Sequence, residues 1–358
     1  MARPEYVDHR KRRRVSLPID PLLPLQKADI TMTSREQVHW GIIGTANIAR
    51  AVFLPGLRQA GGHPAAVAGR DAGRAEQFAR DNEIGRSVEG YQNLIDDPDI
   101  DALYIPLPNA LHAEWTIRAL EAGKPALCEK PLCGTLPDTE RVLAAARRTG
   151  TLLWEAFSFP FHAQFERIRA LVADGAIGEL MEIKSNFHFS LTRPGNIRYS
   201  RDLQGGALLD VGCYPVRLAT ELFGPARESC WAQARWGGSD VDVDTWAVVD
   251  YPAGRRLLLS CGFGRSYDTF TALEGTGGQI HVTNPFHPGP ADSYQLTTAR
   301  TEPSTFPAAH DELSFTAITR HINAVLRGEQ EPRLLATDTA LSTAQALHEL
   351  AESAERHR

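Results

Sequence analysis

A lysine, an aspartate and a tyrosine are placed in this sequence where together they could transfer a proton. Lys130 follows a short apolar run at 126–128, and Tyr214 comes four residues after Asp210, so the latter two side chains share one face of a predicted helix. An ammonium group beside a tyrosine lowers the pKa of the phenol from its usual value of about 10 and stabilises an oxyanion as it forms. Hydride addition to a ketone leaves such an oxyanion. Lys130 and Tyr214 therefore suit carbonyl reduction, with Asp210 orienting either the lysine or the hydroxyl groups of a substrate.

A short loop near the start of the ordered pattern resembles a dinucleotide-binding turn. Residues 41–49 spell GIIGTANIA, an imperfect form of GxGxxG in which Gly44 makes the tight turn and Ala46 and Ala49 replace the second and third glycines. The loop joins a predicted strand to a helix that starts near Asn47, so a pyrophosphate would meet the positive end of that helix. The residues expected to contact the dinucleotide here are Gly44, Thr45, Ala46, Asn47 and Ile48.

The end of the second predicted strand, at 64–69, bears on the choice between NAD and NADP. Enzymes that use NAD usually place an acidic residue there to bind the ribose 2′-hydroxyl. This chain has Gly69 followed by Arg70, with Arg74 one helical turn further on. A guanidinium at this point binds a 2′-phosphate through charge-assisted hydrogen bonds, which favours NADP(H). Asp71 could serve as a displaced ribose ligand, but it fits better as the N-cap of the following helix.

These residues require a scaffold that brings the ends of several strands together. Apolar strand-like runs are predicted at 38–44, 64–69, 102–105, 126–128 and 151–155. Helices are predicted between them at 48–60, 71–82, 111–122 and 137–149. Strands that alternate with helices at this spacing predict a doubly wound parallel sheet, an α/β Rossmann domain over residues 38–157.

The pattern changes after about residue 157. Strands are predicted at 180–190, 229–236, 245–251, 256–263, 269–274 and 279–283. Helices are predicted at 207–223, 312–327 and 337–356. The run of strands predicts an α+β domain over 158–358, built on a large, mostly antiparallel sheet that binds substrate and joins subunits.

Bulk composition narrows the classes of partner. The 358 residues suit two domains, and a net charge of −6 gives no electrostatic reason to expect nucleic acid or an anionic membrane. No apolar run approaches the roughly 20 residues that span a bilayer. The five cysteines form no CxxC pair, which favours neither a disulfide framework nor a metal site and points to a reducing cytoplasm.

Residues 1–37 differ from the rest of the chain. The basic run at 9–14 and the prolines that follow it have no amphipathic period, so a flexible N-terminal arm is predicted. Two alternatives stay open: a proline-rich arm that wraps a neighbouring subunit, or a true start at Met32.

Two further segments resemble the Gfo/Idh/MocA oxidoreductases from about residue 38 to the C-terminus. Glu129-Lys130-Pro131 matches their EKP motif, and residues 205–215, GGALLDVGCYP, match GGGxLxDxGxH with Tyr214 where many members have histidine. The segment 105–109, IPLPN, followed by a histidine, resembles their nicotinamide-side loop. The resemblance implies further cofactor contacts from Pro106, Leu107, Asn109, His112, Glu129 and Lys130.

The tyrosine variant resembles a narrower branch, which includes sugar 3-ketoreductases, dihydrodiol dehydrogenases and glucose–fructose oxidoreductase. The segments 155–157 and 197–199 fit this branch, whereas Pro160 stands where an arginine is often found. The substrate contacts implied are Lys130, His162, Arg198, Tyr199, Asp210 and Tyr214.

The activity implied by this branch is NADPH-dependent reduction of a keto group on a sugar, at C-3 of a dTDP-linked keto-deoxysugar, by a homodimer or homotetramer. Two alternatives stay open. One is NADP-dependent oxidation of a trans-dihydrodiol or a free sugar, and the other is a non-catalytic NADP-binding regulatory protein.

Overall fold

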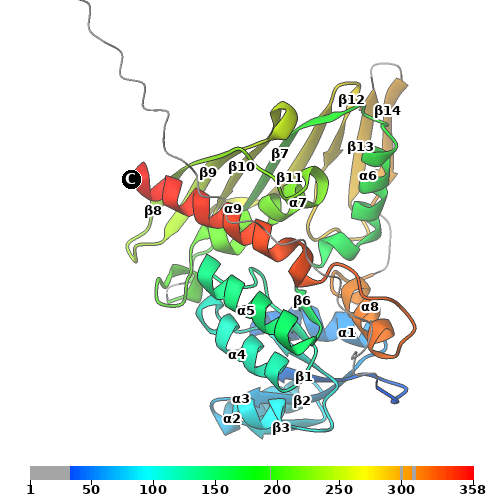
Figure 1. Cartoon of the computed structure of the whole chain (residues 1–358), viewed down its shortest axis with the longest axis vertical. Coiled ribbons are helices and arrows are strands. Elements are labelled where there is room, and N and C mark those ends of the chain that lie inside the picture. The colour runs from blue at the N-terminus through cyan, green and yellow to red at the C-terminus, as the bar shows by residue number, and fades with distance from the viewer. Residues whose placement is uncertain (1–32, 194, 299–300, 309–311) are drawn as a thin grey trace, which may run out of the picture.

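Six parallel strands form the N-terminal sheet, in the order β3-β2-β1-β4-β5-β6 (Figure 1). They are β1 His39–Ile43, β2 His63–Gly69, β3 Arg86–Glu89, β4 Ala102–Ile105, β5 Ala126–Cys128 and β6 Leu153–Glu155. Four of the five predicted runs, in β1, β2, β4 and β5, are apolar nearly throughout, as a sheet covered on both faces requires. The strand order reverses between β1 and β4, which confirms the predicted Rossmann fold.

The computed structural model describes residues 33–193, 195–298, 301–308 and 312–358. The predicted arm therefore lies almost entirely outside the described residues, as does Met32. Within the described ranges, no helix has both the length and the apolar character that are needed to cross a membrane.

Helices cover both faces of the parallel sheet. One face shares an apolar cluster with α4 and α5, and the other with α1 and α8. The helices are α1 Leu54–Gln59, α2 Ala72–Asp81, α3 Tyr91–Ile95, α4 Asn109–Glu121, α5 Leu136–Thr149 and α8 Thr316–Leu326. The position of α8 was not predicted: it comes from far along the chain, and the indole Nε1 of Trp40 in β1 donates to Asn323 Oδ1 at 2.9 Å.

Eight strands form the C-terminal sheet, in the order β14-β13-β12-β11-β7-β10-β9-β8. They are β7 Leu180–Ser190, β8 Ser229–Trp236, β9 Asp242–Tyr251, β10 Arg255–Gly262, β11 Gly264–Gly275, β12 Gly278–Val282, β13 Ser293–Thr298 and β14 Thr301–Pro307. Neighbouring strands are antiparallel except β7 and β10, so the predicted α+β architecture is confirmed.

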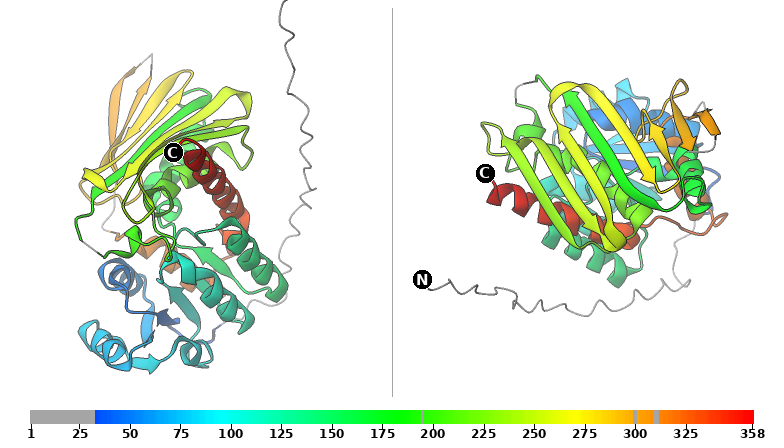
Figure 2. Two further views of the ribbon diagram at one scale, coloured as in Figure 1. Left: turned by 90° about the vertical axis from the view of Figure 1, so that its left-hand side faces the viewer. Right: turned by 90° about the horizontal axis from the view of Figure 1, so that it is seen from above.

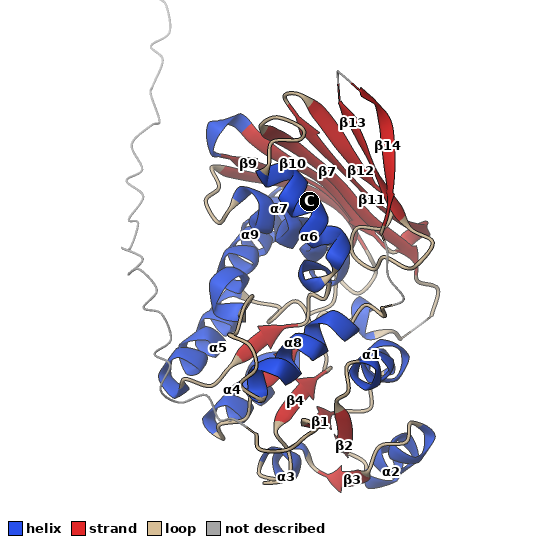
Figure 3. Cartoon of the chain, turned by 90° about the vertical axis from the view of Figure 1, so that its right-hand side faces the viewer, coloured by secondary structure: helices blue, strands red, loops and turns tan. Residues whose placement is uncertain are grey.

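Helices α7 (Cys213–Phe223) and α9 (Ala336–Arg356) lie along one face of this sheet (Figure 3). Alternate residues of β10, Leu257 and Leu259, point toward them and are buried, as the two-residue period of a strand requires. The right-hand view of Figure 2 looks onto the opposite face, whose strands are open to view. A further helix, α6 (Ala163–Ala173), precedes β7 and was not predicted.

Candidate active site

Four of the predicted residues stand at the carboxyl ends of neighbouring parallel strands. Gly44 follows β1, Arg70 follows β2, Pro106 follows β4, and Lys130 comes two residues after β5. These ends share one edge of the sheet, and the strand order reverses there between β1 and β4. Ligands of open parallel sheets bind at such a reversal.

The loop after β1 makes the tight turn that was predicted at its glycine. Gly44 has a φ of +103°, which side chains other than glycine rarely allow, and its amide donates to the Ala68 carbonyl at 2.8 Å. A Cβ atom at Gly44 would stand 3.0 Å from Leu107 Cδ2 in the loop after β4. Thr45 and Ala46 are partly exposed next to it, so a ligand can reach the helix that begins at Asn47.

The end of β2 presents two arginines to solvent. Gly69 permits close packing of α2 on the strand, because a Cβ there would stand 2.9 Å from Ala75 Cβ. Asp71 Oδ1 accepts a hydrogen bond from the Arg74 amide at 2.7 Å, which confirms its predicted role as N-cap. Arg70 and Arg74 are exposed, and neither guanidinium has an ion-pair partner among the described residues.

His112 is fully buried and joins two loops of the site. Its Nε2 lies 2.8 Å from the Leu107 carbonyl oxygen, and its Nδ1 lies 3.0 Å from that of Pro131. Burial lowers its pKa, against the effect of these carbonyls, so the imidazole is neutral. His112 therefore supports the loops.

Asn109 contacts the C-terminal part of the chain, where its Nδ2 donates to the Gln204 carbonyl at 2.8 Å.

Glu129 is held inside the protein by a tyrosine that the sequence patterns did not single out. The hydroxyl of Tyr104 donates to Glu129 Oε1 at 2.6 Å, and the Lys130 amide donates to Oε2 at 3.2 Å. Burial raises the pKa of Glu129, although the charge of Lys130 opposes this effect. The backbone that carries Lys130 is thereby anchored to β4.

A partly buried cluster of charges joins the loop after β5 to two helical turns of the C-terminal domain. Lys130 Nζ donates to the Asp210 carbonyl at 2.6 Å and lies 3.3 Å from Asp210 Oδ1, while Arg198 Nε donates to Oδ2 at 2.6 Å. Burial alone would raise the pKa of Asp210, but Lys130 and Arg198 outweigh it, so the pKa is lowered. Burial would lower the pKa of Lys130, but Tyr214 and Asp210 outweigh it and the pKa is raised. The pair is ionised, and Asp210 orients the lysine.

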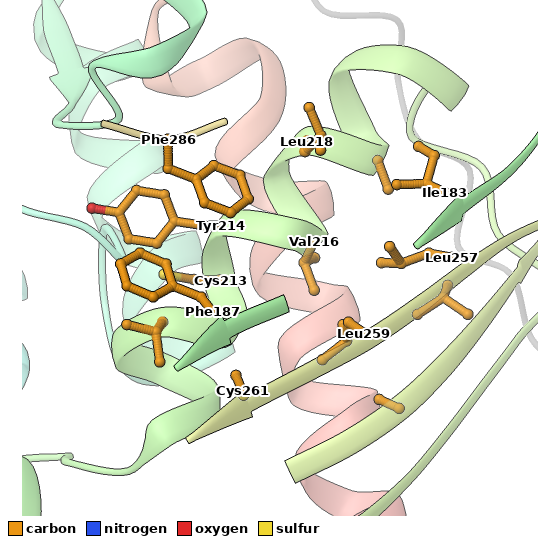
Figure 4. Close-up of a cluster of buried hydrophobic side chains, with 14 of the residues drawn as sticks. Ile183, Phe187, Cys213, Tyr214, Val216, Leu218, Leu257, Leu259, Cys261 and Phe286 are labelled. Carbon is orange, nitrogen blue, oxygen red and sulfur yellow. The ribbon is translucent and has the colours of Figure 1, made fainter. Parts of the chain in front are cut away.

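Tyr214 stands beside this cluster, in an aromatic pocket. Its side chain packs between Phe187 and Phe286, whose ring centroids lie 5.3 and 5.1 Å away, and the hydroxyl points away from the apolar cluster (Figure 4). Lys130 Nζ lies 4.9 Å from the centre of the tyrosine ring. Among the described residues, no side chain or backbone group hydrogen-bonds the hydroxyl, so it is available to a ligand.

The pKa of Tyr214 corrects one expectation. Lys130 acts in the predicted direction and lowers the pKa, but burial has the larger effect and raises it above its ordinary value. The expectation of a lowered pKa is therefore wrong, because the apolar pocket has a larger effect on the phenol than the neighbouring charge has. The consequence is a tyrosine that stays protonated over the whole physiological range.

The helix that carries Asp210 and Tyr214 is fixed at its start by Asp242, a residue at the beginning of β9. Asp242 Oδ2 accepts from the Leu208 amide at 2.7 Å and from the Thr245 hydroxyl at 2.8 Å. Gly206, with a φ of +113°, passes so close to this carboxylate that a Cβ would collide with it. Leu208–Gly212 forms a π-helical turn that leads into α7. The paired glycines at 205–206 were the only sequence signal of this contact.

Two predicted substrate ligands also make contacts within the protein, and their part in substrate binding stays a prediction. His162 is buried, and its Nδ1 accepts from the Gln164 amide at 3.1 Å, which caps α6. The hydroxyl of Tyr199 donates to the Leu191 carbonyl at 2.7 Å. Arg198 does reach the site, through Asp210. Sequence reasoning missed His287, in the loop after β12, whose ring centroid lies 5.3 Å from that of Tyr214.

Replacing Asp242 with alanine is expected to lower the free energy of unfolding by about 1–3 kcal/mol, because two buried donors lose their acceptor. Denaturant unfolding measures this change. Asp250→Ala, on the same strand but more exposed, serves as the control and is expected to cost less. Equal losses in the two variants would show that Asp242 has no special role at the helix start.

Comparison with known proteins gives consistent matches over most of the chain. Residues 38–157 match an oxidoreductase family described as having an NAD-binding Rossmann fold, and residues 165–281 match the GFO/IDH/MocA C-terminal domain. A dTDP-3,4-didehydro-2,6-dideoxy-alpha-D-glucose 3-reductase from Saccharopolyspora spinosa is 40% identical over 256 residues, covering 71% of this chain and 77% of that protein.

Two further relatives are informative. A trans-1,2-dihydrobenzene-1,2-diol dehydrogenase from Xenopus laevis is 34% identical, covering 68% of this chain and 74% of its own. Among solved structures, a 3-ketoreductase from Actinomadura kijaniata, in complex with NADP and TDP-benzene, is 33% identical with a TM-score of 0.81. That match covers 88% of this chain and 98% of the other.

Proposed function

This chain belongs to the Gfo/Idh/MocA family of oxidoreductases, and on that premise we propose that it uses NADPH to reduce a ketone on a dTDP-linked keto-deoxysugar, at C-3. The observation that carries the proposal is that Lys130, which is far from Asp210 and Tyr214 in the sequence, lies beside both of them in the structure. No described group forms a hydrogen bond with the hydroxyl of Tyr214. The substrates named for the dTDP-sugar reductase and for the dihydrodiol dehydrogenase each carry oxygens on two adjacent carbons. We therefore propose a substrate with this arrangement.

NADP(H) fits the residues at the carboxyl edge of the parallel sheet. The positive φ of Gly44 and the partly exposed Thr45 and Ala46 leave backbone open for a pyrophosphate, and Arg70 and Arg74 present charge for a 2′-phosphate. When bound, the reduced cofactor supplies the hydride for the carbonyl carbon.

Lys130 and Tyr214 carry out the rest of the reaction. The ammonium of Lys130, held by Asp210, stabilises the negative charge that develops on the carbonyl oxygen, and its effect is strengthened because both side chains are largely shielded from water. The hydroxyl of Tyr214 holds the proton that this oxygen takes. Once the proton has left, Lys130 stabilises the phenolate until solvent reprotonates it. The raised pKa of Tyr214 keeps its hydroxyl protonated near neutral pH, which is the form that donates a proton in reduction.

The assignment of NADP over NAD is tested by Arg70→Ala. Loss of a charge-assisted contact to the 2′-phosphate is expected to raise the KM for NADPH by about 10- to 100-fold and to leave the KM for NADH unchanged. Arg147→Ala, which removes an exposed arginine from α5, is the control for loss of surface charge. If Arg70→Ala changes neither KM, or both equally, the arginine does not select NADP.

The proposed reaction is tested by following NADPH consumption with dTDP-linked 3-ketosugars, free sugars and, in reverse with NADP, trans-dihydrodiols. The expected result is the highest kcat/KM with the nucleotide-linked ketosugar. Preference for the dihydrodiol or the free sugar would overturn the assignment of substrate. Absence of any turnover by a protein that binds NADPH would favour a non-catalytic, regulatory role.

A further inference from the structure

His287 is held in a fixed position on the wall of the site that also carries Tyr214. Its ring stands at 76° to the tyrosine ring, with centroids 5.3 Å apart, and Phe187 lies 6.1 Å away on another side. The side chain of Asn284 hydrogen-bonds both backbone groups of His287. Its Nδ2 donates to the His287 carbonyl at 2.7 Å, and its Oδ1 accepts from the His287 amide at 3.3 Å. Asn284 is itself fixed by Asp292 at 3.0 Å.

The imidazole of His287 is neutral and has unused hydrogen-bonding capacity. Burial, together with the charge of Lys130, lowers its pKa to about 4, so near neutral pH one ring nitrogen carries a proton and the other is a bare acceptor. Among the described residues, neither ring nitrogen has a hydrogen-bond partner, and the side chain is only partly buried. Both nitrogens are therefore open to a ligand.

Two buried histidines of this chain differ in this respect. Both ring nitrogens of His112 lie within 3.0 Å of backbone carbonyls, and in His321 Nδ1 lies 3.1 Å from Gln330 Oε1 while Nε2 accepts from the Arg333 amide at 3.2 Å. Histidines that only fill the core have their polar atoms satisfied by the protein in this way. The nitrogens of His287 instead have no hydrogen-bond partner among the described residues, and its ring packs against the tyrosine to which we assign proton donation.

We propose that His287 is a substrate-binding residue that hydrogen-bonds the oxygen on the carbon next to the reacting carbonyl, and so selects substrates with two adjacent oxygenated carbons. This inference rests on the proposed ketone reduction. Tyr214 and Lys130 act on the reacting oxygen, and the ring of His287 packs edge-on against that of Tyr214, so the oxygen one carbon away is the substrate group that we assign to its nitrogens. A neutral imidazole suits either kind of neighbour, because it donates to a carbonyl oxygen and accepts from a hydroxyl.

The test compares two substrates with the full-length chain and NADPH: a dTDP-linked 3-ketosugar that keeps its 4-oxygen, and the corresponding 4-deoxy-3-ketosugar. His287→Ala is expected to lower kcat/KM about 10- to 100-fold for the first substrate and less than about threefold for the second. His287→Asn, which retains a donor and an acceptor, is expected to recover part of the loss. His348→Ala, at an exposed histidine on α9, is the matched control and is expected to change neither value.

The outcomes separate this inference from the function on which it rests. Equal losses of kcat/KM on both substrates, or no loss on either, would overturn the role of His287 while leaving ketone reduction established by the parent protein. Failure of the parent protein to consume NADPH with either ketone would overturn the proposed function, and this inference would fall with it. Thermal unfolding of each variant shows whether a lost activity reflects a lost fold, and His287→Asn then decides the result.

Discussion

Tyr214→Phe is expected to lower kcat for ketone reduction by about 10²- to 10⁴-fold, because the hydroxyl that holds the transferable proton is removed. The fold should be kept: the ring still fills the space between Phe187 and Phe286, and the hydroxyl has no hydrogen-bond partner among the described residues. NADPH consumption under saturating ketone measures kcat. Binding of NADPH, followed by fluorescence, should be unchanged.

The matched control is Tyr251→Phe, which removes the same atom from a buried tyrosine on β9 that packs against Phe223, away from the charge cluster. It is expected to retain activity. The pH profile gives a second check: with the parent protein, reduction should persist above pH 10 and fall as pH rises through the raised pKa of Tyr214. Near-normal turnover in a folded Tyr214→Phe protein would show that another group donates the proton.

Lys130→Met is the second change with a large expected effect, a loss of about 10²- to 10³-fold in kcat. Methionine keeps much of the apolar length of the side chain but removes the charge that stabilises the oxyanion. Asp210 keeps Arg198 as its partner, so the variant should still fold. Lys130 also lowers the pKa of Tyr214 against the effect of burial, so its loss moves that pKa further up. Steady-state kinetics across a pH series measures both effects.

Lys184→Met, at an exposed lysine on β7, controls for removal of a lysine as such and should leave kcat unchanged. A parallel fall in both variants would point to a general effect of charge. Unchanged kcat in Lys130→Met, with the fold verified by circular dichroism, would mean that the oxyanion is stabilised elsewhere.

The parallel sheet could be predicted because burial on both faces leaves a strong mark on a sequence. Strands β4 and β5 are apolar throughout, and the predicted bounds are those observed. Strand β3 was missed because most of its residues are polar and none is buried, and β14 because nearly all of its residues are exposed and most are polar. Helix α6 was missed because it lies between two regions of strand-like pattern and has only a short apolar face.

The charge cluster was anticipated only in part. Motifs identified Lys130, Asp210 and Tyr214, and the structure brings them together through contacts between residues 80 or more positions apart. Asp242 and His287 carry no local signal, since each is a single polar residue whose partner comes from another element. The net pKa of Tyr214 depends on the aromatic residues around it, which come from three separate segments. Such properties arise from packing and not from spacing along the chain.

The hydrogen bond between Trp40 and Asn323 spans 283 positions, and it has a consequence for how the chain is made. Helix α1 covers part of one face of the first sheet and α8 covers the rest, so that second part stays exposed until the ribosome has synthesised most of the second domain. We expect the nascent N-terminal half, with this apolar surface exposed, to bind chaperones. A fragment ending near residue 157 should accordingly be prone to aggregate, and supplying residues 312–358 in trans should improve its recovery in soluble form.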